Sequence, residues 1–129
     1  MPAPTRSNPS TVAAPVGAYS HLAKIAAGSD IFYIAGQVGM RPDGVVPMGI
    51  AEQADQAYAN IVHILASEGL TPAHLVKLNI FAVDGNDVAA VRAARAKHLG
   101  EVHPASTFVF VPKLVDPKFQ IEIEAVACR

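Results

Sequence analysis

The sequence of 129 residues is poor in several residue types, and each scarcity excludes a class of protein. Its single cysteine, Cys128, cannot form a disulfide within the chain. Only 16% of the residues are charged and the net charge is −1, so the chain offers no strongly basic surface for nucleic acid. No apolar run reaches the ~18 residues of a membrane span, and the proline-rich start lacks the apolar core of a secretory signal. We therefore expect a cytoplasmic protein with neither nucleic acid nor a membrane as its partner.

Known patterns of metal-binding and catalytic residues are also missing. Five histidines are scattered along the chain, at His21, His63, His74, His98 and His103. None of them forms the His-x-x-x-His pair of many zinc sites. The sequence has neither a G-x-S-x-G nucleophile motif nor a glycine-rich phosphate-binding loop. We expect no metal and no cofactor.

Apolar residues, in contrast, are abundant. They make up 51% of the chain, which is enough for one domain with a substantial core. The low share of charged residues suggests that another subunit covers part of the surface. Residues 1–129 are therefore predicted to form a single domain, in which residues 1–16, with four prolines, are an extended or flexible arm.

Hydrophobic periodicity divides the chain into strands and helices. Alternating and β-branched runs predict strands at residues 21–26, 31–35, 75–83, 103–111 and 119–127, and helical spacing predicts helices at residues 51–68 and 87–99. A Gly-Ser-Asp turn between the first two strands predicts an antiparallel hairpin. The order ββαβαββ predicts an α+β fold, with one mixed sheet and two helices on one face. The other face is too apolar for water, so we expect other subunits to cover it.

The last predicted strand carries two carboxylates, Glu122 and Glu124, within an apolar run. Their spacing places both on the same face of the strand. Burying a carboxylate costs several kcal/mol unless a partner group pairs with it. The two residues therefore lie either on a solvated face or in a site, and the alternation by itself favours water.

Six short motifs, in their order and spacing, resemble the Rid family, which is also called YjgF or L-PSP. They are Gly17-Ala18-Tyr19-Ser20, Ile34-Ala35-Gly36-Gln37, Gln53 with Ala57 and Asn60, Leu75-Val76-Lys77, Pro104-Ala105-Ser106-Thr107 and Glu122-Ile123-Glu124-Ala125. The resemblance implies a chorismate-mutase-like fold of the bacillus type. It also implies a homotrimer whose sheets form a barrel-like core, with one pocket at each subunit interface. Such an assembly would cover the bare sheet face.

In the best-studied branch of the family, the resemblance implies hydrolysis of 2-imino or enamino acids to 2-keto acids and ammonia. Tyr19 and Gly36 match ligand-binding positions, and Glu122 matches the acid that works with the attacking water. Ser106 stands where the family has an arginine that binds the substrate carboxylate, and Phe108 stands where many relatives have a cysteine. Serine offers one neutral hydrogen bond in place of a two-pronged ion pair, and losing a charged contact costs about 2–5 kcal/mol. We therefore do not expect 2-imino acid deaminase activity.

The sequence favours a trimer that binds a small, neutral or weakly polar metabolite at these residues, with Glu122 acting through a bound water if a hydrolytic reaction occurs. One alternative is a non-enzymatic trimer with a binding, chaperone-like or regulatory role. A weaker alternative is a deaminase in which Arg92 replaces the missing arginine. A solvated Arg92 on an exposed helix face is the simpler interpretation of that residue.

Overall fold

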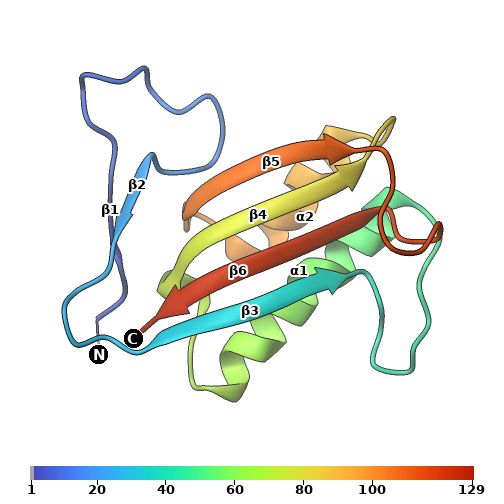
Figure 1. The fold of residues 1–129 in the computed structure, drawn as a ribbon, viewed down its shortest axis with the longest axis horizontal. Coiled ribbons are helices and arrows are strands. Elements are labelled where there is room, and N and C mark those ends of the chain that lie inside the picture. Colours follow the sequence, from blue (N-terminus) through green and yellow to red (C-terminus); the bar gives the residue numbers. More distant parts are fainter. Residues whose placement is uncertain (1) are drawn as a thin grey trace.

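The computed structural model describes residues 2–129. In chain order the elements are β1 (Thr5–Ser7), β2 (Leu22–Lys24), β3 (Ile31–Val38), α1 (Ile50–Ser67), a 3-10 turn (Pro72–His74), β4 (Leu75–Val83), α2 (Val88–Leu99), β5 (Ala105–Val111) and β6 (Ile121–Cys128). Four strands form one sheet in the order β3-β6-β4-β5 (Figure 1). β4 and β5 are parallel, whereas β6 is antiparallel to both of its neighbours. Both helices lie on one face of the sheet, which confirms the α+β class.

The predicted hairpin between the first two strands is wrong. β2 pairs with β1 in a separate two-stranded sheet, and β3 pairs with β6. Arg6 holds the small sheet against the rest of the chain, because its Nη2 atom donates to the carbonyls of Ala73 (2.9 Å) and Leu75 (2.7 Å). The arm predicted at residues 1–16 thus contains a strand that gives β2 its partner. A turn signal after β2 cannot reveal this competing partner, because the partner precedes β2 in the chain.

The helices begin and end within one residue of the predicted bounds. Asp87 caps α2, because its side chain accepts a hydrogen bond from the backbone N–H of Ala89 at 2.9 Å. After α1, Gly69 has a φ of +71°, a left-handed conformation that favours glycine and ends the helix. No helix within residues 2–129 is long and apolar enough to cross a membrane.

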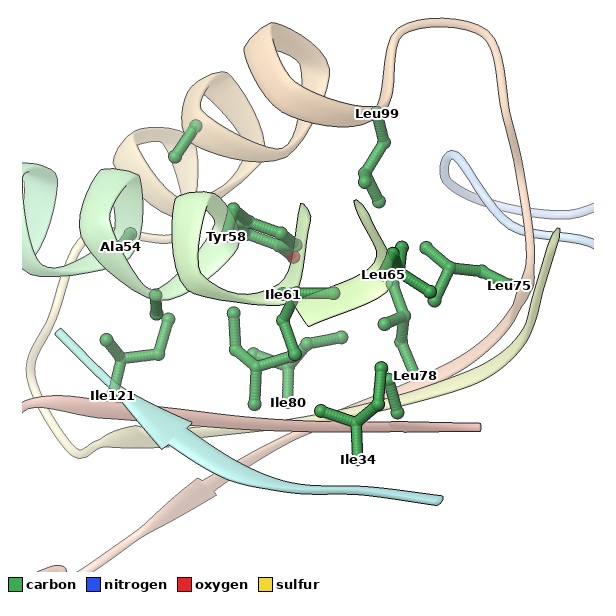
Figure 2. Close-up of a cluster of buried hydrophobic side chains, with 14 of the residues drawn as sticks. Ile34, Ala54, Tyr58, Ile61, Leu65, Leu75, Leu78, Ile80, Leu99 and Ile121 are labelled. Atoms are coloured by element: carbon green, nitrogen blue, oxygen red, sulfur yellow. The ribbon is translucent and has the colours of Figure 1, made fainter. Parts of the chain in front are cut away.

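The hydrophobic core lies between α1 and the sheet (Figure 2). Tyr58, Ile61 and Leu65 of α1 are almost completely buried, in one cluster with Leu78 and Ile80 of β4. Burial raises the pKa of Tyr58 to about 12. The phenol therefore stays neutral in the folded protein until the solution is strongly alkaline.

We expect Tyr58→Phe to reduce the loss of stability in alkali. An unfolded tyrosine ionises near pH 10, whereas folded Tyr58 has a pKa of about 12. The contribution of Tyr58 to stability is thus complete below about pH 10 and is lost between about pH 10 and 12, by roughly 3 kcal/mol in full and by about half of that at pH 11. Urea unfolding at about pH 8 and about pH 11 measures the loss. Equal losses in the wild type and in Tyr58→Phe would contradict this prediction.

Two polar motif residues of α1 bind the backbone of neighbouring segments. Gln53 is 2% exposed, and its Nε2 atom donates to the carbonyls of Pro47 and Lys118, both at 2.9 Å. Its Oε1 atom accepts a hydrogen bond from the backbone N–H of Gln120 at 2.8 Å. Asn60, one of the other motif residues, donates to two carbonyls at and just beyond the end of β3. These motif residues therefore fix the loops at one end of the sheet.

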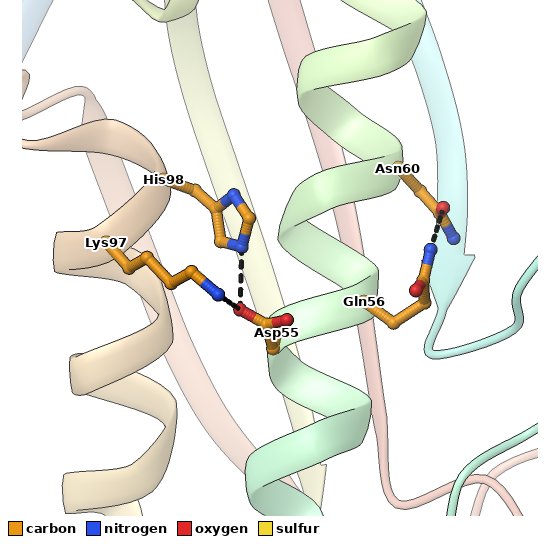
Figure 3. Close-up of polar contacts among 5 residues, drawn as sticks. All are labelled: Asp55, Gln56, Asn60, Lys97 and His98. Carbon is orange, nitrogen blue, oxygen red and sulfur yellow. Dashed lines mark hydrogen bonds and ion pairs between the residues drawn. The ribbon is translucent and has the colours of Figure 1, made fainter.

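An exposed ion-pair cluster joins the two helices (Figure 3). The Oδ1 atom of Asp55 on α1 accepts a hydrogen bond from Nζ of Lys97 at 2.8 Å and lies 2.9 Å from Nε2 of His98, both on α2. The hydrogen bond from Lys97, followed by that from His98, holds the pKa of Asp55 below its usual value. Because water screens exposed pairs, this cluster stabilises the fold only modestly.

We expect Asp55→Asn to lower the free energy of unfolding by less than about 1 kcal/mol at neutral pH. The pKa of Asp55 is lowered on folding, so its contribution is present above about pH 4 and is lost as the pH falls through the folded value. The stabilities of wild type and variant should therefore converge in acid, as measured by urea unfolding. A difference that stays constant from neutral to acid pH would contradict this role.

The sheet face that the helices leave uncovered, called the open face here, mixes apolar and charged side chains. By the strand registers, its residues include Lys77, Asn79 and Phe81 of β4, Thr107 and Val109 of β5, Glu122, Glu124 and Val126 of β6, and Tyr33 of β3. The alternate residues, such as Leu78 and Ile80, are buried under the helices. Tyr33 is 83% exposed and Val109 is 40% exposed. The protein thus has the bare sheet face that the element order predicts, but the face is less apolar than predicted, because five of these residues are polar or charged.

Candidate functional site

β3 contains a β-bulge near its C-terminal end. The pairing register with β6 shifts between Ile34 and Gln37, so Ala35 and Gly36 together lie opposite a single residue. A bulge leaves backbone groups outside the regular ladder and redirects nearby side chains, and it is common beside binding sites. The second family motif thus corresponds to a local break in the sheet.

The side chain of Glu122 lies directly over Gly36. A Cβ atom added to Gly36 would lie 2.8 Å from Cδ and 2.9 Å from Cγ of Glu122, which is closer than real Cβ atoms approach. The φ angle of Gly36 is not positive, so the glycine is needed for space and not for an unusual conformation. The fold therefore brings these two predicted site residues together.

Tyr19 lies near the opposite edge of the sheet, beside the start of β5. The next residue, Ser20, forms a parallel bridge with Ala105, and its backbone N–H donates to the carbonyl of Pro104 at 3.2 Å. The motif that contains Tyr19 is thereby fixed next to the motif that contains Ser106. Tyr19 itself is partly exposed.

Ser106 and Phe108 project from β5 toward the helix layer. They are in register with Leu78 and Ile80, which are buried beneath the helices. The Oγ atom of Ser106 donates to a backbone carbonyl two residues earlier, at 3.1 Å. Phe108 packs against the core. Neither side chain shares the open face with Glu122.

Within one chain, the predicted site is therefore divided into two halves. Tyr19, Ser106 and Phe108 lie at the β5 edge of the sheet, and Gly36 and Glu122 lie toward the β3 edge. Two hollows of about 380 and 300 Å³ are found elsewhere, one between β3 and the end of α1 and one at the start of α1. None of these five residues lines either hollow.

The remaining candidates lie apart from both halves. Arg92 is exposed on α2, in the helix layer, and forms no ion pair within residues 2–129. Glu124, which the sequence left undecided, is exposed on the open face and accepts a hydrogen bond from Nδ2 of Asn79 at 3.1 Å. Cys128 is fully buried, and burial raises the pKa of its thiol, as expected for an unreactive cysteine. Across the described chain, no three His, Cys, Asp or Glu side chains gather where they could hold a metal ion.

Comparison with known proteins assigns the family. Residues 10–129 match the family model described as Endoribonuclease L-PSP. The chain is 36% identical over 125 residues to a protein of Capra hircus named 2-iminobutanoate/2-iminopropanoate deaminase, with 93% of this chain and 88% of that protein covered. It is 37% identical over 118 residues to a RutC family protein of Pyrococcus horikoshii, with 89% and 90% covered.

The solved structures agree with this assignment. The crystal structure of a protein of unknown function from Yersinia pestis, a member of the conserved Rid protein family, has a TM-score of 0.87 to this chain at 32% identity, with 98% of each chain covered. Two helices on one face of a mixed sheet are the chorismate-mutase-like fold of that family. The chain therefore belongs to the Rid family, also called the YjgF or L-PSP family.

Proposed function

We propose that the protein works as a homotrimer that binds a small, neutral or weakly polar metabolite in three pockets, one between each pair of subunits. The division of the candidate residues between two sides of the sheet supports this proposal. In a closed ring, the β5 edge of one copy would meet the β3 edge of the next, and the two halves would complete one site. The same arrangement would bury the apolar part of the open face, which includes Tyr33 and Val109.

Glu122 is the proposed catalytic residue. Its carboxylate would accept a proton from a bound water while the oxygen of that water bonds to the carbon of a C–N or C=N group in the ligand. The Glu122 carboxyl would then return the proton to the nitrogen, so that the C–N bond breaks and the nitrogen leaves as ammonia or an amine. Gly36 leaves the room that this carboxylate needs, and the bulge supplies backbone groups outside the ladder. Tyr19 would orient the ligand through its hydroxyl. Hydrolytic release of nitrogen also agrees with the deaminase name of the Capra hircus relative.

Ser106 decides the class of ligand. The goat relative is named for 2-imino acids, whose carboxylate group calls for a cation in the pocket. Ser106 is neutral, and its hydroxyl donates to the carbonyl of Pro104, just before β5. Phe108, at the same edge, adds apolar surface. We therefore propose that the ligand lacks a carboxylate and that 2-imino acids are poor substrates.

A 2-imino acid deaminase that recruits Arg92 is the second candidate, and the 36% identity to a named deaminase favours it. Arg92 is exposed and has no ion-pair partner within the described residues. In this candidate, its guanidinium would reach the pocket from the helix layer. Only this candidate predicts rapid release of ammonia from 2-iminobutanoate.

Two measurements test the proposed ligand class. We expect no ammonia release above buffer from 2-iminobutanoate generated in situ, at micromolar protein. In a thermal-shift screen, we expect a neutral metabolite to stabilise the protein by about 2.7 kcal/mol at about 100 times its Kd. Glu122→Gln should abolish any turnover of that metabolite. Binding without turnover in the wild type would favour the non-enzymatic role.

Rapid ammonia release by the wild type would overturn the proposed ligand class. Loss of that release in Arg92→Ala, with the fold intact by circular dichroism, would then support the second candidate. Ammonia release that survives Arg92→Ala would contradict both candidates, because the protein would then bind the substrate carboxylate through some other group.

A further inference from the structure

The open face carries three charged side chains that form no ion pair within the part of the chain that the structure describes. They are Lys77 on β4 and Glu122 and Glu124 on β6. Burying an unpaired charge costs several kcal/mol, so any partner that covers this face must supply the opposite charges.

Neutral neighbours already orient two of these charges. The Nζ atom of Lys77 donates to Oγ1 of Thr107 at 3.0 Å, and Nδ2 of Asn79 donates to Oε1 of Glu124 at 3.1 Å. The ammonium group has two further donors, and the carboxylate has a second oxygen. Asn79 lies directly opposite Glu124, and Lys77 lies opposite Val126, so the two charges are one diagonal step apart. The side chains of Lys77 and Glu124 are therefore both oriented by a hydrogen bond, and each can form further hydrogen bonds.

Glu122 points to a different part of the face. Its carboxylate lies over Gly36, at the bulge beside β3. Glu124 is therefore the acid that shares the centre of the open face with Lys77. Apolar side chains, including Tyr33 and Val109, lie on the same face and would exclude water from a covered ion pair.

We propose that Lys77 of one copy pairs with Glu124 of the next copy across the open face, and that this pair sets the register in which the copies associate. The inference rests on the homotrimer proposed above. On this face the cation lies toward the β5 edge and the acid toward the β3 edge. With the β5 side of one copy against the β3 side of the next, the long side chains of Lys77 and Glu124 would reach toward each other over the two edge strands that lie between them. A second copy is the occupant because the charges of the face are complementary to themselves, and a closed ring repeats the pair at every interface.

Charge reversal tests the pair. Lys77→Glu and Glu124→Lys each place like charges at the interface, so we expect each to weaken association by about 100-fold in sedimentation equilibrium. The double variant restores opposite charges and should recover at least about tenfold of the affinity. Lys113→Glu and Glu52→Lys are matched controls, because both residues are exposed and lie outside the open face. These controls should leave association unchanged.

Three results would overturn the pair while leaving the trimer in place. They are single reversals that associate like the wild type, a double variant that shows no recovery, and rescue of Lys77→Glu by Glu122→Lys in place of Glu124→Lys. If the reversed variants do not fold by circular dichroism, the neutral variant Lys77→Met with Glu124→Gln replaces them. Its association should lose most of the salt dependence seen in the wild type, and an unchanged salt dependence would overturn the pair.

Failure of the homotrimer itself would be seen in the wild-type protein, which would then sediment as a monomer at micromolar concentration. That mass would overturn the proposed homotrimer and, with it, the pair. The two failures are therefore distinguishable by the mass of the unmodified protein.

Discussion

Arginine in place of Ser106 should give the protein 2-imino acid deaminase activity. Ser106→Arg places a planar, two-pronged donor at the β5 edge, next to the motif that contains Tyr19. A charged contact of this kind contributes about 2–5 kcal/mol, so kcat/KM for 2-iminobutanoate should rise roughly 30-fold to a few thousand-fold. Ammonia release from the imine generated in situ measures the gain. The partly exposed position of Ser106 leaves space for the longer side chain.

Two variants at the same position serve as controls. Ser106→Gln adds length without charge and should give no activity, and Ser106→Lys adds a point charge without the planar fork and should give a smaller gain. Glu122→Gln combined with Ser106→Arg should abolish the new activity, because the proposed proton acceptor is then missing. A folded, trimeric Ser106→Arg protein with no gain would refute the assignment of Ser106 to the carboxylate-binding position.

Replacement of Gln53 by leucine should destabilise the fold by at least about 3 kcal/mol. The amide of Gln53 forms three hydrogen bonds, to the carbonyls of Pro47 and Lys118 and to the N–H of Gln120. Leucine fills a similar volume but leaves these backbone groups without partners. A buried group left unpaired costs about 1–3 kcal/mol, and the two partly buried groups lie at the lower end of that range. Urea unfolding measures the loss, and limited proteolysis should show early cleavage in the loop between β5 and β6.

Gln56→Leu is the matched control, one turn along the same helix. Its Nε2 atom donates only to Oδ1 of Asn60, at 2.8 Å, so no buried backbone group loses its partner directly. We expect its cost to be below about 1 kcal/mol. Equal losses in the two variants would show that the amide of Gln53 does not hold the loops.

Local patterns were sufficient for most of the fold. α1, α2 and β4 follow from spacing along the chain, with helix bounds within one residue of those predicted. The partner of β2 could not be predicted in this way. It depends on Arg6, which binds the carbonyl of Ala73, 67 residues away in sequence. The interior role of Gln53 was missed for the same reason, since it depends on where two distant loops meet the helix.

The candidate site depended much less on local pattern. Alternation along β6 favoured water for Glu122, and only the family motifs assigned it to a site. Its contact with Gly36 depends on a bulge, which shifts the register by one residue and leaves no periodic signal in the sequence. The separation of Ser106 from Glu122 depends on the strand order, because it places their strands on different sides of β4 and their side chains on different faces.

β6 is the last strand in sequence but lies inside the sheet, between β3 and β4 (Figure 1). During synthesis, β3 and the β4–β5 pair therefore have no common neighbour until residues 121–128 have left the ribosome. Until then, the growing chain exposes two unpaired strand edges, which are sites of aggregation. Insertion of β6 pairs residues 31–38 with residues that are far away in sequence, and such non-local pairing is slow. The emergence of β6 is thus also the step that covers these edges and protects the chain from aggregation.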